Sequence, residues 1–184
     1  YTIKKERKAI SGLKIALWGD LKHGRTVHSL IFALAKLGAN IIFCPTPGLE
    51  VPKHVIQKLI SEYGGEMERI EAPEKQGEKG MSNIDAIYIT PGSPHQLAMM
   101  PNINIHLGLK RGVDALYVTR PQKERFTDND EGNDLRDRYP VVDKKLLREK
   151  EFEKTIIMHP LPRVDELACE LDGDPRSMYF KQAA

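Results

Sequence analysis

The sequence predicts an α/β fold, a doubly wound and mostly parallel sheet with helices on both faces. Segments typical of buried strands alternate with segments whose apolar residues recur at the three- and four-residue spacing of an amphipathic helix. The first five segments, in the order strand, helix, strand, helix, strand, are 13–18, 26–37, 40–44, 51–63 and 66–72. Alternation at this spacing is typical of parallel strands joined by right-handed crossovers. At 184 residues the chain is long enough for one substantial domain.

Glycines mark the ends of the predicted helices. Gly38 is a natural stop for the helix at 26–37, and Gly64 with Gly65 would end the helix at 51–63. The segment 73–83 that follows is polar and contains proline and glycine, which predicts a solvated loop. These residues divide the first half of the chain into the elements that a parallel sheet needs.

A near-repeat of a strand-like segment occurs further along the chain. Asp-Ala-Ile-Tyr-Ile-Thr-Pro at 85–91 recurs, almost residue for residue, as Asp-Ala-Leu-Tyr-Val-Thr-Arg at 114–120. Two units do not make a repeat architecture. We therefore interpret both copies as strands with similar demands on burial, in preference to a functional duplication.

The remaining elements are predicted from shorter patterns. The stretch 127–139 is highly charged and predicts a surface loop, and 142–150 and 155–158 are expected to form a helix and a strand. Asp174-Pro175-Arg176 is expected to open a final short helix, because proline is favoured at the first helical position.

Composition argues against several classes of function. Lys and Arg number 28 against 26 Asp and Glu, so the net charge of +2 gives no field that would recruit nucleic acid or an anionic membrane. No apolar run approaches the length of a bilayer span, and a cytoplasmic protein is expected. No Ser-His-Asp or Cys-His arrangement and no His/Cys cluster emerges, so we expect neither a covalent nucleophile nor a bound metal.

The segment from Gly19 to Thr26 follows the first predicted strand and has the spacing of a phosphate-binding loop, with Arg25 in place of the usual lysine. A P-loop-like NTPase is disfavoured, because that lysine reaches the distal phosphates and no later strand ends in the acid that would hold magnesium. What remains is a helix N-terminus with partial positive charge and Arg25 in its first turn. The alternative is that Arg25 pairs with an acid on the surface.

Arg120 and Gln122 lie at the end of another predicted strand, where the alternation of side chains directs both to the same side. The planar fork of arginine matches a carboxylate, and glutamine adds a donor that can orient a further oxygen or amine. Lys123, Glu124 and Arg125 are expected to form an ion-pair cluster that braces the strand end rather than to bind a ligand directly.

His159-Pro160-Leu161-Pro162-Arg163 follows the last predicted strand. The two prolines limit the backbone of Leu161, which favours its carbonyl as a preorganised hydrogen-bond acceptor. A histidine in such a place is more often a packed structural residue than a ligand. Ligands of open α/β sheets bind where strands end, so three such ends, two of them with an arginine, suit a small and doubly anionic substrate.

Three motifs, in this order, resemble the catalytic chain of aspartate carbamoyltransferase, specifically its aspartate-binding second domain. They are GDLK-x-GRTVHS at 19–29, LY-x-TR-x-QKER at 116–125 and MHPLPRVDE at 158–166. The related ornithine enzyme typically has Cys after the His of the last motif and lacks its Arg. The resemblance implies a Rossmann-like carbamoyltransferase domain. It also implies transfer of the carbamoyl group of carbamoyl phosphate to L-aspartate, giving N-carbamoyl-L-aspartate and phosphate in de novo pyrimidine synthesis without a cofactor.

The resemblance also implies roles for individual residues. Arg25, Arg120 and Gln122 would hold the two carboxylates of aspartate and set its amine in line. The Leu161 carbonyl and the neighbouring Pro162 would contact the reacting carbamoyl or amino group. The residues expected to support this site are Lys22, Lys123, Glu124 and His159.

The resemblance covers nearly the whole chain, so residues 1–184 are expected to form one aspartate-binding domain with an inserted segment at 91–113. Relative to the family, the carbamoyl-phosphate domain and the C-terminal helix that returns to it are expected to be absent, and the chain alone would be an incomplete enzyme. Pro121 replaces the usual aliphatic residue of its motif. The complete enzyme is expected to be a homotrimer. The alternative is a catalytically inactive binding or assembly module with the same fold.

Overall fold

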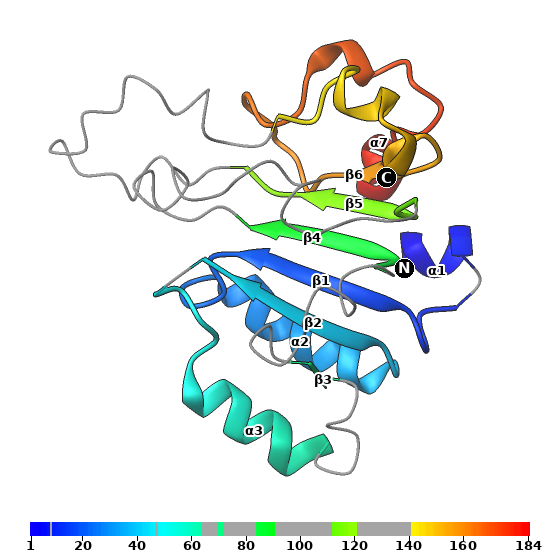
Figure 1. The fold of residues 1–184 in the computed structure, drawn as a ribbon. Helices are drawn as coiled ribbons and strands as arrows, with labels where there is room; N and C mark the ends of the chain where they lie inside the picture. Colours follow the sequence, from blue (N-terminus) through cyan, green and yellow to red (C-terminus); the bar gives the residue numbers. More distant parts are fainter. Residues whose placement is uncertain (8, 47, 64–69, 72–83, 91–111, 121–140) are drawn as a thin grey trace, which may run out of the picture.

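The protein is built on a six-stranded sheet with order β3-β2-β1-β4-β5-β6, in which every pair of neighbouring strands is parallel (Figure 1). A computed structural model describes residues 1–7, 9–46, 48–63, 70–71, 84–90, 112–120 and 141–184. The strands are β1 (Lys14–Gly19), β2 (Asn40–Pro45), β3 (Ile70–Glu71), β4 (Ala86–Thr90), β5 (Ala115–Val118) and β6 (Ile156–Met158). This order is that of a doubly wound α/β fold, which confirms the predicted fold class.

The helices α2 (Arg25–Lys36) and α3 (Lys53–Tyr63) cover one face of the sheet (Figure 1). Their apolar residues recur on one side, so that Val27 and Ile31 of α2 and Leu59 of α3 are buried together with Leu17 and Ile41 of the strands. The N-terminal helix α1 (Thr2–Arg7) packs against the same cluster of side chains. Burial of each large apolar side chain contributes about 1.5–3 kcal/mol, so this layer is held mainly by the hydrophobic effect.

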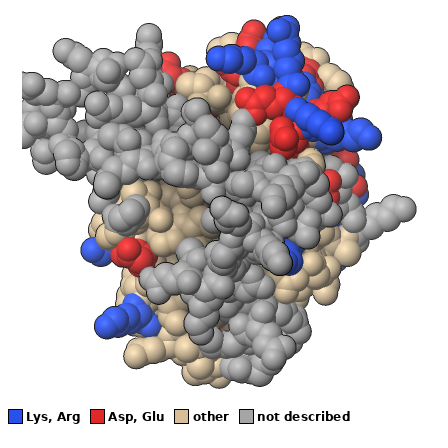
Figure 2. Space-filling model, viewed as in Figure 1, with Lys and Arg blue, Asp and Glu red and all other residues tan. Residues whose placement is uncertain are grey.

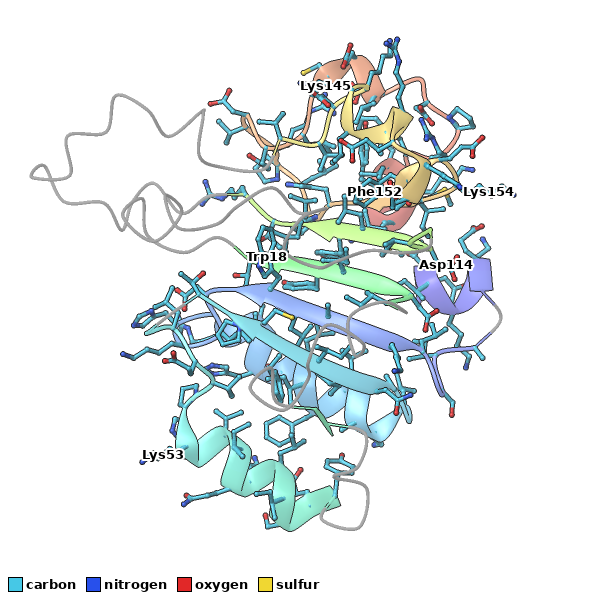
Figure 3. The ribbon with its side chains drawn as sticks, viewed as in Figure 1. Trp18, Lys53, Asp114, Lys145, Phe152 and Lys154 are labelled. Carbon is cyan, nitrogen blue, oxygen red and sulfur yellow. The ribbon has the colours of Figure 1, made fainter. Side chains whose placement is uncertain are left out.

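The C-terminal part of the chain covers the opposite face. Phe152 and Tyr179 are both 0% exposed and belong to a second core cluster with Leu116 and Ile157 of the sheet. Figure 3 shows Phe152 between the sheet and the turns of this part of the chain, and Figure 2 shows charged side chains of both signs gathered on its outer surface. Its helical elements are the 3-10 turns η5 (Leu146–Arg148), η6 (Lys150–Phe152) and η7 (Cys169–Leu171) and the short helix α7 (Tyr179–Ala183).

The near-repeat in the sequence corresponds to strands β4 and β5, which lie side by side in matching register. Ala86 pairs with Ala115 and Tyr88 with Tyr117, so each residue of one copy faces its counterpart in the other. The two tyrosine rings stack with their centroids 4.9 Å apart. The similarity therefore reflects equal burial at equal positions in the sheet, which confirms the interpretation of both copies as strands.

The prediction of a helix at 142–150 is wrong, because this segment contains only the turn η5 and the start of η6. Val142 instead forms an isolated parallel bridge, and its N–H donates to the Glu166 carbonyl at 2.9 Å. The Asp143 carboxylate accepts the Leu146 N–H at 2.8 Å, and Glu149 is extended with ψ of 140°. Side-chain acceptors close in sequence compete with helical hydrogen bonds, so single turns form in place of a helix.

The prediction that the final helix begins at Asp174-Pro175-Arg176 is also wrong, since α7 begins at Tyr179. The Arg176 carbonyl accepts the Ile157 N–H at 2.8 Å, which places this segment alongside strand β6. Within the segment, the Asp174 carboxylate accepts the Arg176 N–H at 2.9 Å. Pairing with a strand edge thus delays the start of the helix beyond the proline.

Several predicted segments lie outside the described residues. They are the loops at 73–83 and 127–139, almost all of the inserted segment at 91–113, and most of the strand at 66–72, of which the structure describes β3 alone. In the described parts of the chain, no helix combines the length and the apolar character needed to cross a membrane.

Arg176 links several segments of the C-terminal part of the chain through an ion pair and hydrogen bonds. Its Nη2 lies 2.7 Å from Oδ2 of Asp174, and its Nη1 donates to the backbone carbonyls of Leu147 at 3.0 Å, Phe152 at 3.3 Å and Glu153 at 3.0 Å. The hydrogen bond from Arg176 lowers the pKa of the Asp174 carboxyl to about 2, although burial acts in the opposite direction. The ion pair is therefore fully formed at neutral pH.

We expect acid to remove the contribution of this pair to stability. An unfolded aspartate has a pKa of about 3.9, so the stabilisation is present above about pH 4 and is lost as the pH falls toward about 2. Because the pair lies near the surface, we expect a loss of about 1 kcal/mol. Urea unfolding followed by Trp18 fluorescence at a series of pH values measures it. Asp174→Asn is the matched control: an equal loss on acidification in both proteins would contradict the assignment.

Candidate functional site

The carboxyl ends of β1, β4, β5 and β6 meet at one edge of the sheet (Figure 1). Gly19 at the end of β1 pairs with Thr90 of β4, and Ile89 of β4 pairs with Val118 of β5. The strand order reverses between β1 and β4, and ligands of open α/β sheets bind in the crevice outside such a switch point. The three motifs singled out in the sequence follow β1, β5 and β6, so all three come to this edge.

Gly19 allows the ends of β1 and β4 to approach each other closely. Its φ is +110°, and a Cβ atom at this position would lie 1.8 Å from the Thr90 carbonyl oxygen. The N–H of the next residue, Asp20, donates to the same oxygen at 3.2 Å. Only glycine fits such a conformation and such a contact, so this residue lets the chain turn from β1 into the loop that precedes α2.

The buried Asp20 carboxylate shapes that loop. Its Oδ1 accepts the backbone N–H of Lys22 at 3.0 Å and of His23 at 2.9 Å, and its Oδ2 lies 3.1 Å from Nδ1 of His23. From α2, Nε2 of His28 lies 2.9 Å from the Leu21 carbonyl oxygen and ties the loop to the helix. Aspartate commonly stabilises turns through such bonds to following N–H groups. The loop therefore holds the start of α2 in a defined place beside β1.

Helix α2 begins at Arg25, at the carboxyl edge of the sheet. Gly24 precedes it and has no side chain to cap the helix, which leaves the first N–H groups of α2 for an anion. The side chains of Arg25 and Lys22 are exposed. Arg25 makes no ion pair with any residue that the structure describes. The surface ion pair that would explain Arg25 structurally is thus not found in the described parts of the chain.

Arg120 follows β5, on the other side of the switch point. Thr119 fixes the backbone before it, donating to the Ile89 carbonyl from its N–H at 3.2 Å and from its Oγ1 at 3.0 Å. The Arg120 residue is exposed. With neighbouring strands about 4.8 Å apart, the ends of β1 and β5 are separated by about 10 Å, which two arginine side chains can span to reach one small ligand. Pro121, Gln122, Lys123 and Glu124 lie outside the described residues.

The loop after β6 presents Leu161 and Pro162 at the same edge. Leu161 is half-buried with φ of +52°, and a cis peptide bond joins it to the exposed Pro162. His159 is 0% exposed, with its Nδ1 2.9 Å from the Leu161 nitrogen and its Nε2 2.8 Å from Oε1 of Glu166. Both ring nitrogens are engaged within the protein, so His159 supports the loop from beneath rather than facing a ligand.

Glu166 is a residue of this site that the sequence reasoning did not single out. Burial alone would raise the pKa of its carboxyl, but hydrogen bonds from His159 and from the Val164 N–H outweigh that effect and hold the pKa below its ordinary value. Arg163 braces the same loop through a bidentate ion pair with Asp172. The sequence offered one clue, since Glu166 is the last residue of the motif at 158–166 that also contains His159. A buried acid is almost always paired, and His159 is a possible partner close in sequence.

These groups are arranged to bind and orient an anion rather than to form a covalent bond with it. Two exposed arginines and a helix N-terminus lie at one edge, where they attract carboxylates. The side chains of Asp20 and His159 are buried and hydrogen-bonded to their neighbours. Among the described residues, the site therefore supplies position and positive charge.

A cavity of about 360 Å³ lies between α1, α2 and the sheet. The described residues that line it are apolar apart from tyrosine and threonine hydroxyl groups, and none of them has a charged side chain. An anionic substrate needs charged or hydrogen-bonding partners to compensate for the water that it loses. We therefore place the candidate site at the carboxyl edge of the sheet and not in this cavity.

Comparisons with known proteins give matches to carbamoyltransferases. A family model described as "Aspartate/ornithine carbamoyltransferase, Asp/Orn binding domain" matches residues 11–92. The aspartate carbamoyltransferase catalytic subunit of Methanothermobacter thermautotrophicus is 37% identical over 183 residues, which cover 100% of this chain and 46% of that subunit. The corresponding subunit of Clostridium perfringens is 36% identical over 183 residues, with 99% and 48% covered. Over nearly its whole length, the chain is thus similar to about half of an aspartate carbamoyltransferase catalytic subunit.

Solved structures extend this result to the fold of the carbamoyltransferase domain. The catalytic subunit of the Methanocaldococcus jannaschii aspartate transcarbamoylase matches with a TM-score of 0.60 and 33% identity, covering 100% of this chain and 49% of that one. The Trypanosoma cruzi enzyme in complex with aspartate and phosphate matches with a TM-score of 0.57 and 30% identity, covering 99% and 46%. The chain thus spans about half the length of the catalytic subunits that it matches.

Proposed function

We propose that this domain binds L-aspartate at the carboxyl edge of its sheet, in an enzyme that transfers the carbamoyl group of carbamoyl phosphate to the aspartate amine. The observation that supports this most directly is the convergence of Arg25, Arg120 and Leu161 on the edge beside the switch point between β1 and β4. The related Trypanosoma cruzi enzyme has been solved with aspartate and phosphate and with carbamoyl phosphate. The products are N-carbamoyl-L-aspartate and phosphate, and the pathway is de novo pyrimidine synthesis.

In this proposal the two carboxylates of aspartate are held by Arg25, Arg120 and Gln122. Each guanidinium can form a bidentate pair with a carboxylate, and such charge-assisted bonds are stronger than neutral ones. The N-terminus of α2 adds partial positive charge at the same place. The residues that we propose as supports of this arrangement are Lys22, Lys123, Glu124 and His159.

The reaction needs the amine of aspartate to be oriented rather than activated by a covalent intermediate. A bond forms between the amine nitrogen and the carbamoyl carbon, and the bond from that carbon to the phosphate oxygen breaks. The departing phosphate takes the proton that the amine loses. The Leu161 carbonyl is proposed to accept an N–H of the amine and so direct the lone pair of the amine nitrogen at the carbamoyl carbon. Pro162 is proposed to lie beside the reacting group. Orientation and stabilisation of charge supply the catalysis, so the proposal needs no cofactor.

The proposal places carbamoyl phosphate on a second domain, because the related catalytic subunits are about twice as long as this chain. We further propose a homotrimer in the cytoplasm as the working assembly, as in the family that the motifs resemble. A catalytically inactive assembly module would share the fold but would not transfer a carbamoyl group.

Titration of the ¹⁵N-labelled chain with L-aspartate and with L-ornithine, in the presence of carbamoyl phosphate, tests the proposed substrate. L-aspartate is expected to shift the backbone signals of Arg25, Arg120 and Leu161, and L-ornithine is expected to leave them unchanged, because a second cation cannot replace the side-chain carboxylate. Carbamoyl transfer to aspartate, assayed with a carbamoyl-phosphate-binding domain present, then separates the enzyme from the inactive module. Equal shifts with both amino acids would contradict the assignment of aspartate.

A further inference from the structure

The loop after β6 encloses a buried polar pair, His159 and Glu166. Both are 0% exposed, and Nε2 of the imidazole lies 2.8 Å from Oε1 of the carboxylate. Burial of such groups is costly unless their polar atoms find partners. In this pair the polar atoms have partners. The Val164 N–H donates to the Glu166 carboxylate, with its nitrogen 3.2 Å from Oε1 and 3.3 Å from Oε2. The second imidazole nitrogen binds the N–H of Leu161.

Leu161 has a backbone conformation that needs such support. Its φ of +52° lies in the left-handed region, which is unfavourable for a residue other than glycine. Conformations of this kind persist where the surrounding structure holds them, and they concentrate at functional sites. The hydrogen bond of 2.9 Å from the Leu161 N–H to Nδ1 of His159 fixes the backbone of Leu161 at its nitrogen.

The hydrogen bonds determine where the imidazole carries its proton. A nitrogen that accepts an N–H must offer a lone pair, so Nδ1 of His159 is unprotonated and the ring proton lies on Nε2. That proton points to the Glu166 carboxylate, which is the acceptor at 2.8 Å. A proton on Nδ1 would instead face the Leu161 N–H, donor against donor. The carboxylate therefore selects the tautomer that the Leu161 backbone requires.

We propose that Glu166 and His159 are positioning residues for the transfer reaction: the carboxylate keeps the imidazole proton on Nε2, and the free Nδ1 fixes the Leu161 backbone so that its carbonyl faces the substrate amine. This inference rests on the proposed function, which assigns that carbonyl to the amine. Neither side chain touches substrate. Because a misplacement of about 1 Å in an active site can cost about a hundredfold in rate, loss of the pair reduces kcat strongly.

The variants His159→Asn and His159→Leu separate positioning from simple stabilisation. The side-chain oxygen of asparagine can take the place of Nδ1 and accept the Leu161 N–H, whereas leucine offers no acceptor. Both variants leave Glu166 without its imidazole partner, so both lower the free energy of unfolding to a similar extent. We expect kcat for carbamoyl transfer to fall by about a hundredfold in His159→Leu and to be at least about tenfold higher in His159→Asn.

Two further measurements accompany the kinetics. Inhibition by succinate, which has both carboxylates of aspartate but no amine, is expected to change less than about twofold in either variant, because the arginines still hold the carboxylates. Nitrogen NMR of the wild-type ring is expected to show the Nε2–H tautomer of His159. Should His159→Leu fail to fold, Glu166→Gln and Glu166→Leu make the same comparison, since glutamine retains an acceptor for the Nε2 proton and leucine does not.

The outcomes are distinguishable. Equal kcat in the two members of a pair, or an Nδ1–H tautomer in the wild-type protein, overturns the positioning role while leaving the proposed function intact. A wild-type protein that, with a carbamoyl-phosphate-binding domain present, neither transfers carbamoyl groups nor binds succinate overturns the proposed function and this inference together. Higher kcat in the variant that retains the acceptor, at equal stability, supports the inference.

Discussion

Replacement of Arg120 by alanine is expected to weaken aspartate binding by tenfold or more. Each charge-assisted hydrogen bond contributes about 1.5–3 kcal/mol, and about 1.4 kcal/mol corresponds to a tenfold change in affinity. A guanidinium that binds a carboxylate with two such bonds therefore supplies at least that much. Arg120 is exposed at the end of β5 and lies outside both core clusters, so the free energy of unfolding is expected to stay nearly unchanged.

Saturation with aspartate, measured by calorimetric titration and by carbamoyl transfer, shows whether this expectation holds. Arg120→Lys is expected to recover little of the lost affinity, because one ammonium group cannot reproduce the planar fork. Arg148→Ala is the matched control, since Arg148 is an exposed arginine on the turn η5, away from the proposed site. An Arg120→Ala protein that saturates at the wild-type concentration of aspartate would remove Arg120 from the site.

The parallel sheet could be predicted from sequence because each of its elements has a regular period and a local stop. The buried strand β1 and the amphipathic helix α2 differ in the spacing of their apolar residues, and Gly38 ends the helix. The order of the strands then follows from right-handed crossovers and the doubly wound pattern. The near-repeat at 85–91 and 114–120 could also be interpreted correctly, because it contains two neighbouring strands with the same burial.

The C-terminal part could not be predicted in the same way, because side chains there bind backbone groups across the fold. Arg176 donates to the carbonyls of Leu147, Phe152 and Glu153, which are more than twenty positions away in the chain. Such bonds replace the regular hydrogen bonds of a helix with contacts that no local spacing reveals. Periodicity therefore overestimates helix in this region, and both wrong predictions fall there.

The candidate site was predictable in its positions but not in its internal support. Strand ends indicated where Arg25, Arg120 and Leu161 would gather, because the carboxyl edge of an open sheet is set by topology. The partner that orders Leu161, the buried Glu166 acting through His159, depends on the three-dimensional path of the loop after β6. Long-range pairing of this kind becomes visible only once the loop is folded.

Replacement of Gly19 by alanine is expected to have the largest effect on stability in this part of the molecule. The added Cβ would lie 1.8 Å from the Thr90 carbonyl oxygen, and the φ of +110° is one that side chains rarely adopt. Backbone strain costs about 1–3 kcal/mol and forced overpacking about 1–3 kcal/mol more. We therefore expect the free energy of unfolding to fall by about 3–5 kcal/mol, measured by urea denaturation with the neighbouring Trp18 as the probe.

Two other glycines separate these two costs. Gly12 has φ of +82° but nothing within 4 Å of an added Cβ, so Gly12→Ala carries the backbone strain alone, roughly 1–2 kcal/mol. Gly173 has open space and no positive φ, so Gly173→Ala is expected to be neutral or stabilising by up to about 1 kcal/mol. If Gly19→Ala costs no more than Gly12→Ala, the close approach of β1 to β4 is not a constraint. A larger cost for Gly19→Ala means that the close approach of β1 and β4 requires glycine at position 19. The direction in which α2 presents Arg25 to a ligand then depends on this glycine as well.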